Sequence, residues 1–188
     1  MGNENGEGPL PTATNVHHVG VTVPDLDETV EFFVDCLGAR ELYRKGPFGG
    51  GDSDGDEMGR RLGVHPDATA SLAMLRLGPT TNLELFEWDA PGTDDEQPRL
   101  SDAGAAHIAV QVEDADEAAA YIRERDDATL LGEPRTNDDG PTAGLRYVFF
   151  RTPWGGYAEL VETPERMPYA EDTDDSLYGP APSWDLRR

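Results

Sequence analysis

The sequence predicts an α+β fold built from two tandem βαβββ modules, and an internal repeat is the main reason. Residues 18–28 read HVGVTVPDLDE and residues 107–117 read HIAVQVEDADE, so a histidine, two valines and three acidic residues recur at matching places. Later in each copy comes a short apolar segment, NLELFE at 82–87 and YAELVE at 157–162. An alternating strand, a helical pattern and later strands, all occurring twice, indicate a duplicated unit.

The first module is predicted over residues 15–90, after an N-terminus over 1–14 that is expected to be disordered. Its strands are bounded by turn residues, and its helix is stopped by Gly38. An acidic, glycine-rich insertion at 46–66 contains a predicted helical turn. The predicted elements are a strand at 16–23, a helix at 26–37, and strands at 39–45, 69–77 and 82–88.

The second module is predicted over residues 105–163 and repeats this order after a polar linker at 91–104. Its predicted elements are a strand at 106–112, a helix at 114–125, a short strand at 130–131, and strands at 145–151 and 156–162. The tail at 164–188 has no periodicity but carries aromatic residues, so we expect it to pack on the globule or on a partner. These aromatic residues are Tyr169, Tyr178 and Trp184.

The charge of the chain limits its possible partners. Fifteen basic and 38 acidic side chains give a formal net charge of −23. Such a surface repels nucleic acid and anionic lipid, so no nucleic-acid or membrane partner is expected. The acidic residues are scattered along the chain, which is typical of proteins from high-salt organisms, where ions screen the self-repulsion. An acidic interaction tail is the alternative, but only residues 171–175 fit it.

The compartment is predicted from cysteine usage and from the start of the chain. Cys36 is the only cysteine and falls in an apolar helical pattern, so no internal disulfide can form and a reducing cytoplasm is expected. The first residues, MGNENGEGPLPTAT, have neither a basic start nor an apolar run, so they do not resemble a signal peptide.

The repeat also places chemistry-bearing residues at matching positions. His18 corresponds to His107, and Glu84 corresponds to Glu159. Because strand residues alternate between faces, His17 should point away from the face of His18. Two imidazoles and two carboxylates suit a divalent ion such as zinc, nickel, cobalt, manganese or ferrous iron, with positions left for water or substrate. The alternative is that these are solvated strand residues, repeated only because the modules share an ancestor.

On these residues and motifs the chain resembles the vicinal oxygen chelate superfamily, and its glyoxalase I and methylmalonyl-CoA epimerase branch in particular. The resemblance covers roughly residues 15–165. It implies a glyoxalase-like fold, in which paired βαβββ modules form a cupped, barrel-like mixed sheet around one divalent metal ion per site. The positions that match the family's metal ligands are His18, Glu84, His107 and Glu159.

The resemblance implies a metal-dependent lyase or isomerase that acts on a small substrate with vicinal oxygens. A metal that polarises a carbonyl acidifies the neighbouring C–H bond and stabilises the resulting enediolate. Glu159 is then the first candidate for the base and Glu84 for its partner. Arg76, Arg146 and Tyr147 are secondary candidates for holding the substrate.

Two other functions occur on this fold and stay open at this point. Extradiol dioxygenases typically use two histidines and one glutamate, so the fourth candidate, Glu84, favours the lyase or epimerase branch. Bleomycin-resistance-like members bind ligands without turnover and generally lack the metal set. A homodimer is expected, but the sequence leaves open whether a site forms within one chain or between two chains.

Overall fold

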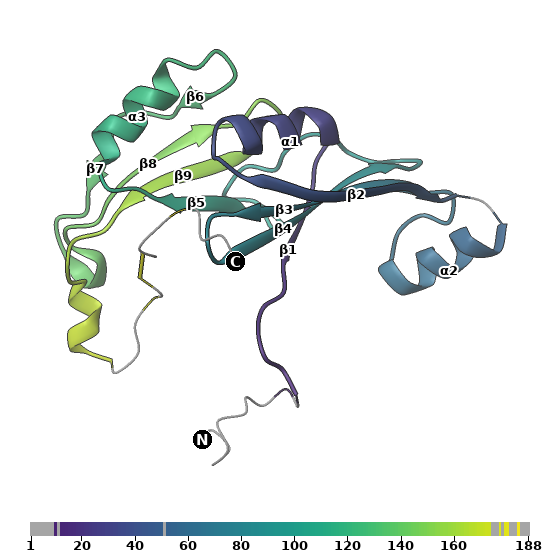
Figure 1. The fold of residues 1–188 in the computed structure, drawn as a ribbon, viewed down its shortest axis with the longest axis horizontal. Helices are drawn as coiled ribbons and strands as arrows, with labels where there is room; N and C mark the ends of the chain where they lie inside the picture. Colours follow the sequence, from purple (N-terminus) through teal and green to yellow (C-terminus); the bar gives the residue numbers. More distant parts are fainter. Residues whose placement is uncertain are drawn as a thin grey trace.

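The computed structural model describes residues 10, 12–50, 52–173, 177, 179–180 and 184, with the side chains of 52–56 left aside. Most of the N-terminal segment that was expected to be disordered, and Tyr178 of the tail, lie outside the described residues. Two β-sheets lie side by side, and both are open and cupped (Figure 1). The predicted α+β class is confirmed, although neither sheet closes into a barrel within the chain.

The first sheet has the strand order β1-β4-β3-β2. Strand β1 runs parallel to β4, whereas the other neighbours are antiparallel. The parallel pair is possible because α1 provides the crossover that two parallel strands need. The strands are β1 (Val19–Thr22), β2 (Arg40–Gly49), β3 (Thr69–Leu77) and β4 (Thr81–Asp89).

The second sheet repeats this topology with the order β5-β9-β8-β6. Here β5 runs parallel to β9, and β8 is antiparallel to its neighbours. A further short strand, β7, pairs with β8 and was not predicted. The strands are β5 (His107–Gln111), β6 (Thr129–Leu130), β7 (Arg135–Thr136), β8 (Arg146–Arg151) and β9 (Tyr157–Glu162).

Helices α1 (Leu26–Asp35) and α3 (Ala115–Arg123) cover the same side of the two sheets (Figure 1). Helix α2 (Asp52–Leu62) projects beyond the far end of β2, and two short 3-10 helices lie at Gly140–Thr142 and Pro168–Glu171. Among the described residues, neither α1 nor α3 covers the opposite side of a sheet, which we call the open face. The described residues contain no helix that is both long and apolar enough to cross a bilayer.

The repeated acidic residues explain where the two long helices begin. The side chain of Asp25 accepts a hydrogen bond from the backbone N–H of Glu28, and Asp114 accepts from the N–H of Glu117. These aspartates are N-caps, which satisfy backbone N–H groups that have no partner inside the helix. Three of the repeated acidic positions, at Asp25, Asp27 and Glu28, thus belong to the first turn or cap of a helix.

A second carboxylate reaches each helix from the last strand of its module. The Leu26 N–H donates to Glu87 Oε2 at 2.7 Å, and the Ala115 N–H donates to Glu162 Oε2 at 2.9 Å. Glu87 and Glu162 occupy equivalent places in β4 and β9. Each hydrogen bond therefore ties a helix N-terminus to the sheet face that the helix covers.

Helix α1 contributes to the hydrophobic cores of both modules. Phe33 packs into the first core, among buried residues of β3 and β4. Its neighbour Phe32 packs into the second core, with ring centroids 6.4 Å from Phe150 and 5.5 Å from Trp154. Since adjacent residues on a helix point in different directions, one helix buries side chains in two cores and holds the modules together.

The insertion at 46–66 is the part of the structure that differs most from the elements predicted from the sequence. Strand β2 continues to Gly49 instead of ending at residue 45, because a register shift between Lys45 and Phe48 lets it keep pairing with β3. Helix α2 is longer than the predicted turn and rests on Gly49 through Met58. Glycine- and aspartate-rich composition predicts a loop, whereas tertiary contacts here stabilise a helix.

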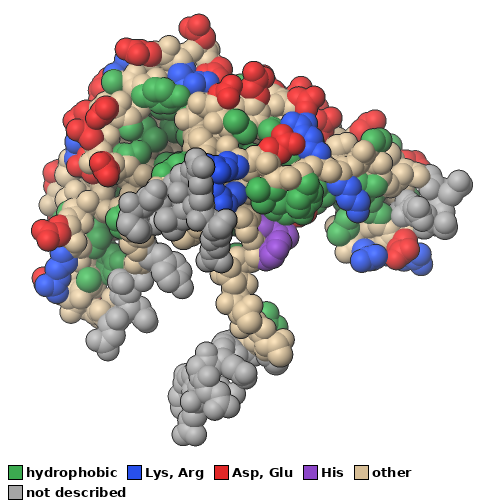
Figure 2. Space-filling model, viewed as in Figure 1, with side chains coloured by type: hydrophobic (Ala, Val, Ile, Leu, Met, Phe, Trp, Pro, Cys, Tyr) green, Lys and Arg blue, Asp and Glu red, His purple; other side chains and the backbone are tan. Residues whose placement is uncertain are grey.

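Acidic side chains are distributed across the visible face of the molecule and do not form one block (Figure 2). This agrees with their scattered positions in the sequence. Cys36, at the end of α1, is partly buried, and burial raises the pKa of its thiol to about 11. Its thiol is therefore neutral at physiological pH, as suits a residue that packs against the second core.

The carboxylate that ties β4 to α1 can be tested by substitution. We expect Glu87→Ala to lower the free energy of unfolding by about 1–2 kcal/mol, because the Leu26 N–H loses a charged acceptor. Glu87→Gln keeps an acceptor oxygen, so its free energy of unfolding should fall by less than that of Glu87→Ala. Glu31→Ala, on the exposed side of α1, is the control and should stay within about 0.5 kcal/mol. Urea denaturation followed by circular dichroism measures this, and equal effects of all three changes would contradict it.

Candidate functional site

The first candidate site lies on the open face of the first sheet, next to the edge strand β1. His18 immediately precedes β1, and Gly20 of β1 pairs with Glu84 of β4. The Nε2 atom of His18 lies 3.0 Å from Oε2 of Glu84. Two members of the predicted ligand set are thus in contact within the first module, and we call His18 and Glu84 the first pair.

The neighbouring residue His17 is not placed as strand alternation predicts. Its Nδ1 atom lies 2.8 Å from Nδ1 of His18, and the rings meet edge to face. Alternation does not apply because β1 begins only at Val19. The carbonyl of His17 accepts a hydrogen bond from the Asn82 side chain, which fixes the backbone just before the first pair.

The second candidate site is equivalent and lies at the edge of the second sheet. His107 is the first residue of β5, and its Nε2 atom lies 3.1 Å from Oε2 of Glu159 in β9. Phe149 pairs with Glu159 across the strands and contacts the His107 ring edge to face at 5.1 Å. We call His107 and Glu159 the second pair.

The glutamates of both pairs are more enclosed than the histidines. The side chains of Glu84 and Glu159 are 19% and 15% exposed, against 35% and 38% for His18 and His107. Both pairs are therefore partly accessible to solvent.

The distances within the pairs suit metal ligands. Two ligands that bind one ion at about 2.1 Å, at about 90° to each other, are about 3.0 Å apart. The same separation also suits a hydrogen bond between imidazole and carboxylate. In the described part of the chain, no three histidine, cysteine, aspartate or glutamate side chains gather closely enough to hold a metal. In the described residues, one chain therefore presents two separate pairs, each with two possible donors.

The secondary candidates are placed differently from one another. Tyr147 lies on the open face with Phe149, the ring that contacts His107, at 6.1 Å between centroids. Arg76 in β3 pairs with Asn82 and lines a cavity near the first pair. Both residues stand on the same faces as the pairs, by their strand register.

Arg146 lies on the helix-covered face of the second sheet and not on the open face. Its guanidinium donates to Asp116 of α3 at 2.8 Å and to Glu162 at 3.1 Å. The hydrogen bond to Asp116 and the nearby Glu162 raise the pKa of Arg146. Because Arg146 is engaged between β9 and α3, its placement supports a structural role instead of substrate contact.

Several residues of these faces were not among the predicted site residues. Phe149 contacts His107, and the Arg151 guanidinium lies over the Tyr157 ring, 3.7 Å from its centroid, and donates to its hydroxyl. Arg40 lines the cavity with Arg76. The signal that identifies them is cross-strand register, because Phe149 is the partner of Glu159 and Arg40 is the partner of Arg76. A single sequence does not reveal these pairings.

Comparisons with known proteins agree with this architecture. A 2-epi-5-epi-valiolone epimerase of an Actinomyces species is 48% identical to the chain over 179 residues, which cover 95% of the chain and 96% of that protein. A glyoxalase family protein of Bacillus cereus has a TM-score of 0.61 at 20% identity, covering 84% of the chain and 99% of its own. Glyoxalase I of Leishmania major has a TM-score of 0.51 at 25% identity, with 80% and 87% covered.

The family assignment rests on the sequence as well as on the fold. Residues 15–160 match the Glyoxalase/Bleomycin resistance protein/Dioxygenase superfamily, and this range contains both pairs. The solved structures share the fold at low identity, whereas the Actinomyces protein shares nearly half of its residues with the chain. The resemblance to the vicinal oxygen chelate superfamily is thus confirmed, and the chain belongs to the glyoxalase/bleomycin resistance protein/dioxygenase superfamily.

Proposed function

We propose that the protein is a divalent-metal-dependent epimerase that acts on a small substrate with vicinal oxygens. The observation that carries the proposal is the presence of one equivalent His–Glu pair on the open face of each module. The relative named 2-epi-5-epi-valiolone epimerase favours epimerisation over a glyoxalase-type reaction. That compound is therefore the first substrate to try.

The four donors would hold the metal together, with His18 and Glu84 from one half and His107 and Glu159 from the other. When bound, a divalent ion polarises a substrate carbonyl and so acidifies the neighbouring C–H bond. Zinc, nickel, cobalt, manganese and ferrous iron all suit two imidazoles and two carboxylates. Water or a pair of substrate oxygens would suit the one or two remaining positions.

The proton transfers belong to the two glutamates. Glu159 accepts the proton from the carbon next to the carbonyl, and the electron pair of the broken C–H bond moves toward the carbonyl oxygen. Glu84, from the other half, delivers a proton to the opposite side of that carbon. One carboxylate from each half is the arrangement that inversion at a single carbon needs.

The two halves are proposed to come from two chains. Helix α1 fixes the modules of one chain through Phe32 and Phe33, and their His–Glu pairs do not meet in that arrangement. The histidines accompany the strands at the edges of their sheets, β1 and β5, so each half is open toward a second copy. In a homodimer, the first pair of one chain would face the second pair of the other.

Metal content tests the donor set directly. Protein purified without added metal or chelator should carry a single transition metal per chain, and His107→Ala or Glu84→Ala should lower that content. His65→Ala, in the loop after α2, is a matched control and should retain the metal. His17→Ala should also retain it, because the first pair uses Nε2 of His18. Elemental analysis measures the content, and absence of metal even after addition of zinc, nickel, manganese or iron would favour a ligand-binding module.

Mixing two inactive variants tests whether sites form between chains. We expect His18→Ala and His107→Ala to be inactive alone and to regain activity after they are unfolded and refolded together. In a mixed dimer with shared sites, one site contains both substitutions and the other contains neither. If each site lies within one chain, every site keeps a substitution and the mixture stays inactive. Deuterium exchange at the substrate carbon is the readout, and a mixture of wild type with His18→Ala calibrates the exchange of subunits.

The role of Glu159 can be separated from folding and metal binding. Glu159→Gln should keep the fold and most of the metal but lower proton exchange by about 100-fold or more, because an amide cannot accept the proton. Glu162→Gln, on the other face of the same strand, still accepts from the Ala115 N–H and should exchange at the wild-type rate. Retained exchange in Glu159→Gln would remove Glu159 as the base. Proton NMR in deuterated water follows the exchange.

A further inference from the structure

The Tyr157 side chain stands on the open face beside the second pair, and the proposed reaction does not use it. Tyr157 is the first residue of β9 and lies next to His107 across β5 and β9. It precedes Glu159 by two residues, so both side chains point to the same face, about 7 Å apart along the strand. Tyr157 is partly buried. It is therefore a neighbour of both members of the second pair.

Arg151, the cross-strand neighbour of Tyr157 on β8, fixes the orientation of the phenol. Its guanidinium lies over the ring, with its central carbon 3.7 Å from the ring centroid. It also donates one hydrogen bond to the Tyr157 hydroxyl and one to the carbonyl oxygen of Gly155, in the turn between β8 and β9. Arginine combines stacking on an aromatic face with hydrogen bonds at its edge. The phenol therefore cannot turn away without losing these contacts.

The hydrogen bond from Arg151 determines which role the Tyr157 hydroxyl can still play. A guanidinium ion only donates hydrogen bonds, so the phenol oxygen is the acceptor. The hydrogen atom of the hydroxyl must then point away from Arg151, and it can be donated to another group. Within the part of the chain that the structure describes, the contact with Arg151 is the only hydrogen bond of this hydroxyl. Its donor position is therefore open to a ligand.

Tyr121 on α3 shows the same arrangement with its donor position filled. Its hydroxyl accepts a hydrogen bond from the Arg125 guanidinium at 3.2 Å and donates one to the carbonyl oxygen of Asp35 at 3.4 Å. That phenol therefore links α3 to the end of α1 and has a structural role. Tyr157 accepts from an arginine in the same way, but it stands on the face that neither helix covers.

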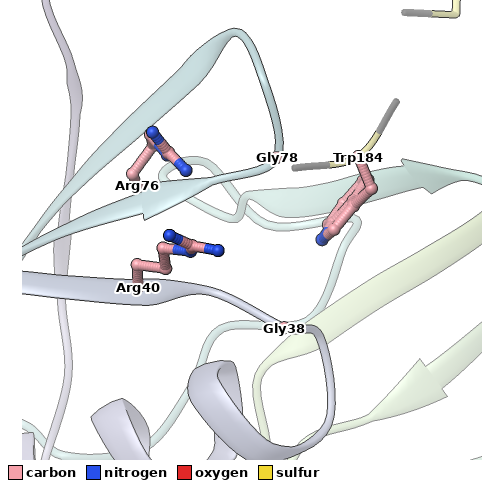
Figure 3. Close-up of a pocket in the computed structure, with 5 residues that line it drawn as sticks. All are labelled: Gly38, Arg40, Arg76, Gly78 and Trp184. Carbon is pink, nitrogen blue, oxygen red and sulfur yellow. The ribbon is translucent and has the colours of Figure 1, made fainter. Parts of the chain in front are cut away.

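The first module has a different side chain at the equivalent place. Asn82 begins the segment that corresponds to the one begun by Tyr157, and its amide donates to the carbonyl oxygen of His17 at 2.8 Å. The cross-strand neighbour of Asn82 is Arg76, which extends toward the cavity shown in Figure 3. In the second module, the equivalent Arg151 is instead stacked on Tyr157. One module thus uses this place to fix its own backbone, whereas the other presents a phenol.

We propose that the Tyr157 hydroxyl donates a hydrogen bond to a hydroxyl oxygen of the substrate, one that does not face the metal, and so selects and orients the substrate. This rests on the proposed function and adds a specificity-determining residue from the second module. The spacing of about 7 Å from Glu159 suits an oxygen on the far side of the same small molecule. A partly buried donor disfavours analogues that lack its acceptor, because it is then left unpaired.

Tyr157→Phe tests this hydrogen bond, because it removes the hydroxyl and keeps the ring beside Arg151. With 2-epi-5-epi-valiolone as the substrate, KM for deuterium exchange should rise about three- to tenfold with little change in kcat, because the hydrogen bond is made to an oxygen that does not react. Tyr121→Phe is the matched control. It removes a hydroxyl that also accepts from an arginine and should leave KM unchanged. An unchanged KM in Tyr157→Phe would overturn the proposal.

Substrate analogues separate a direct contact from a purely structural role of Tyr157. Analogues of 2-epi-5-epi-valiolone that each lack one hydroxyl group remove the acceptor instead of the donor. For one of them, kcat/KM should be the same in wild type and in Tyr157→Phe, because the contact is already lost. If Tyr157→Phe instead lowers kcat/KM by one common factor for every analogue and for the complete compound, Tyr157 acts only through the fold and the proposal is wrong.

Calorimetric titration with 2-epi-5-epi-valiolone distinguishes a failure of this inference from a failure of the proposed function. Binding without proton exchange, weakened by Tyr157→Phe but not by Tyr121→Phe, overturns the epimerase for this substrate and leaves the contact. Exchange with the same KM in wild type and Tyr157→Phe overturns the contact and leaves the epimerase. Neither binding nor exchange of this compound overturns both.

Discussion

In each module, a carboxylate on the last strand accepts a hydrogen bond from the N-terminus of the helix. This hydrogen bond fixes the helix on one face of the sheet and leaves the other face open. Glu87 accepts a hydrogen bond from the Leu26 N–H, and Glu162 accepts one from the Ala115 N–H. Since strand residues alternate, a glutamate three places earlier must point to the opposite, open face. Glu84 and Glu159 stand at those places. The same strand therefore secures the helix on one side and presents a candidate ligand on the other.

The packing of α1 sets how the two open faces relate to each other. Phe32 and Phe33 are both almost fully buried, in different cores, so the modules cannot shift relative to each other without exposing an aromatic ring. In this fixed arrangement the two His–Glu pairs remain separate. The proposed site with four donors would then require association of two chains, and its occupancy would depend on protein concentration. The helix that stabilises the single chain thus keeps the two pairs apart, and the proposed activity would then belong to a dimer.

Much of this could be predicted from the sequence, because the strongest signals are local and are repeated. Alternation, the Asp25 and Asp114 caps and the order of the elements depend on neighbouring residues, and the structure has them near the expected places. That His18 and Glu84 lie close together could be predicted only because the repeat contains a second copy of both residues for comparison. Strand register depends on contacts between distant parts of the chain, and it determines that Arg146 faces α3 and that Arg40 stands beside Arg76. The length of helix α2 was underestimated. Its contact with β2, through Met58, stabilises a helix that its glycine- and aspartate-rich composition does not favour.

The differences between the modules carry as much functional meaning as their likeness. Both keep the His–Glu pair, but the strand positions near it differ. In the first module Arg76 pairs with Asn82, whereas in the second Arg151 packs on the Tyr157 ring and Phe149 contacts His107. Two identical halves would present the same groups to both ends of a substrate. Unequal halves would present different side chains to the two ends of a substrate, so a molecule with different ends would bind in one orientation. That orientation is what would assign one carboxylate to remove the proton and the other to return it.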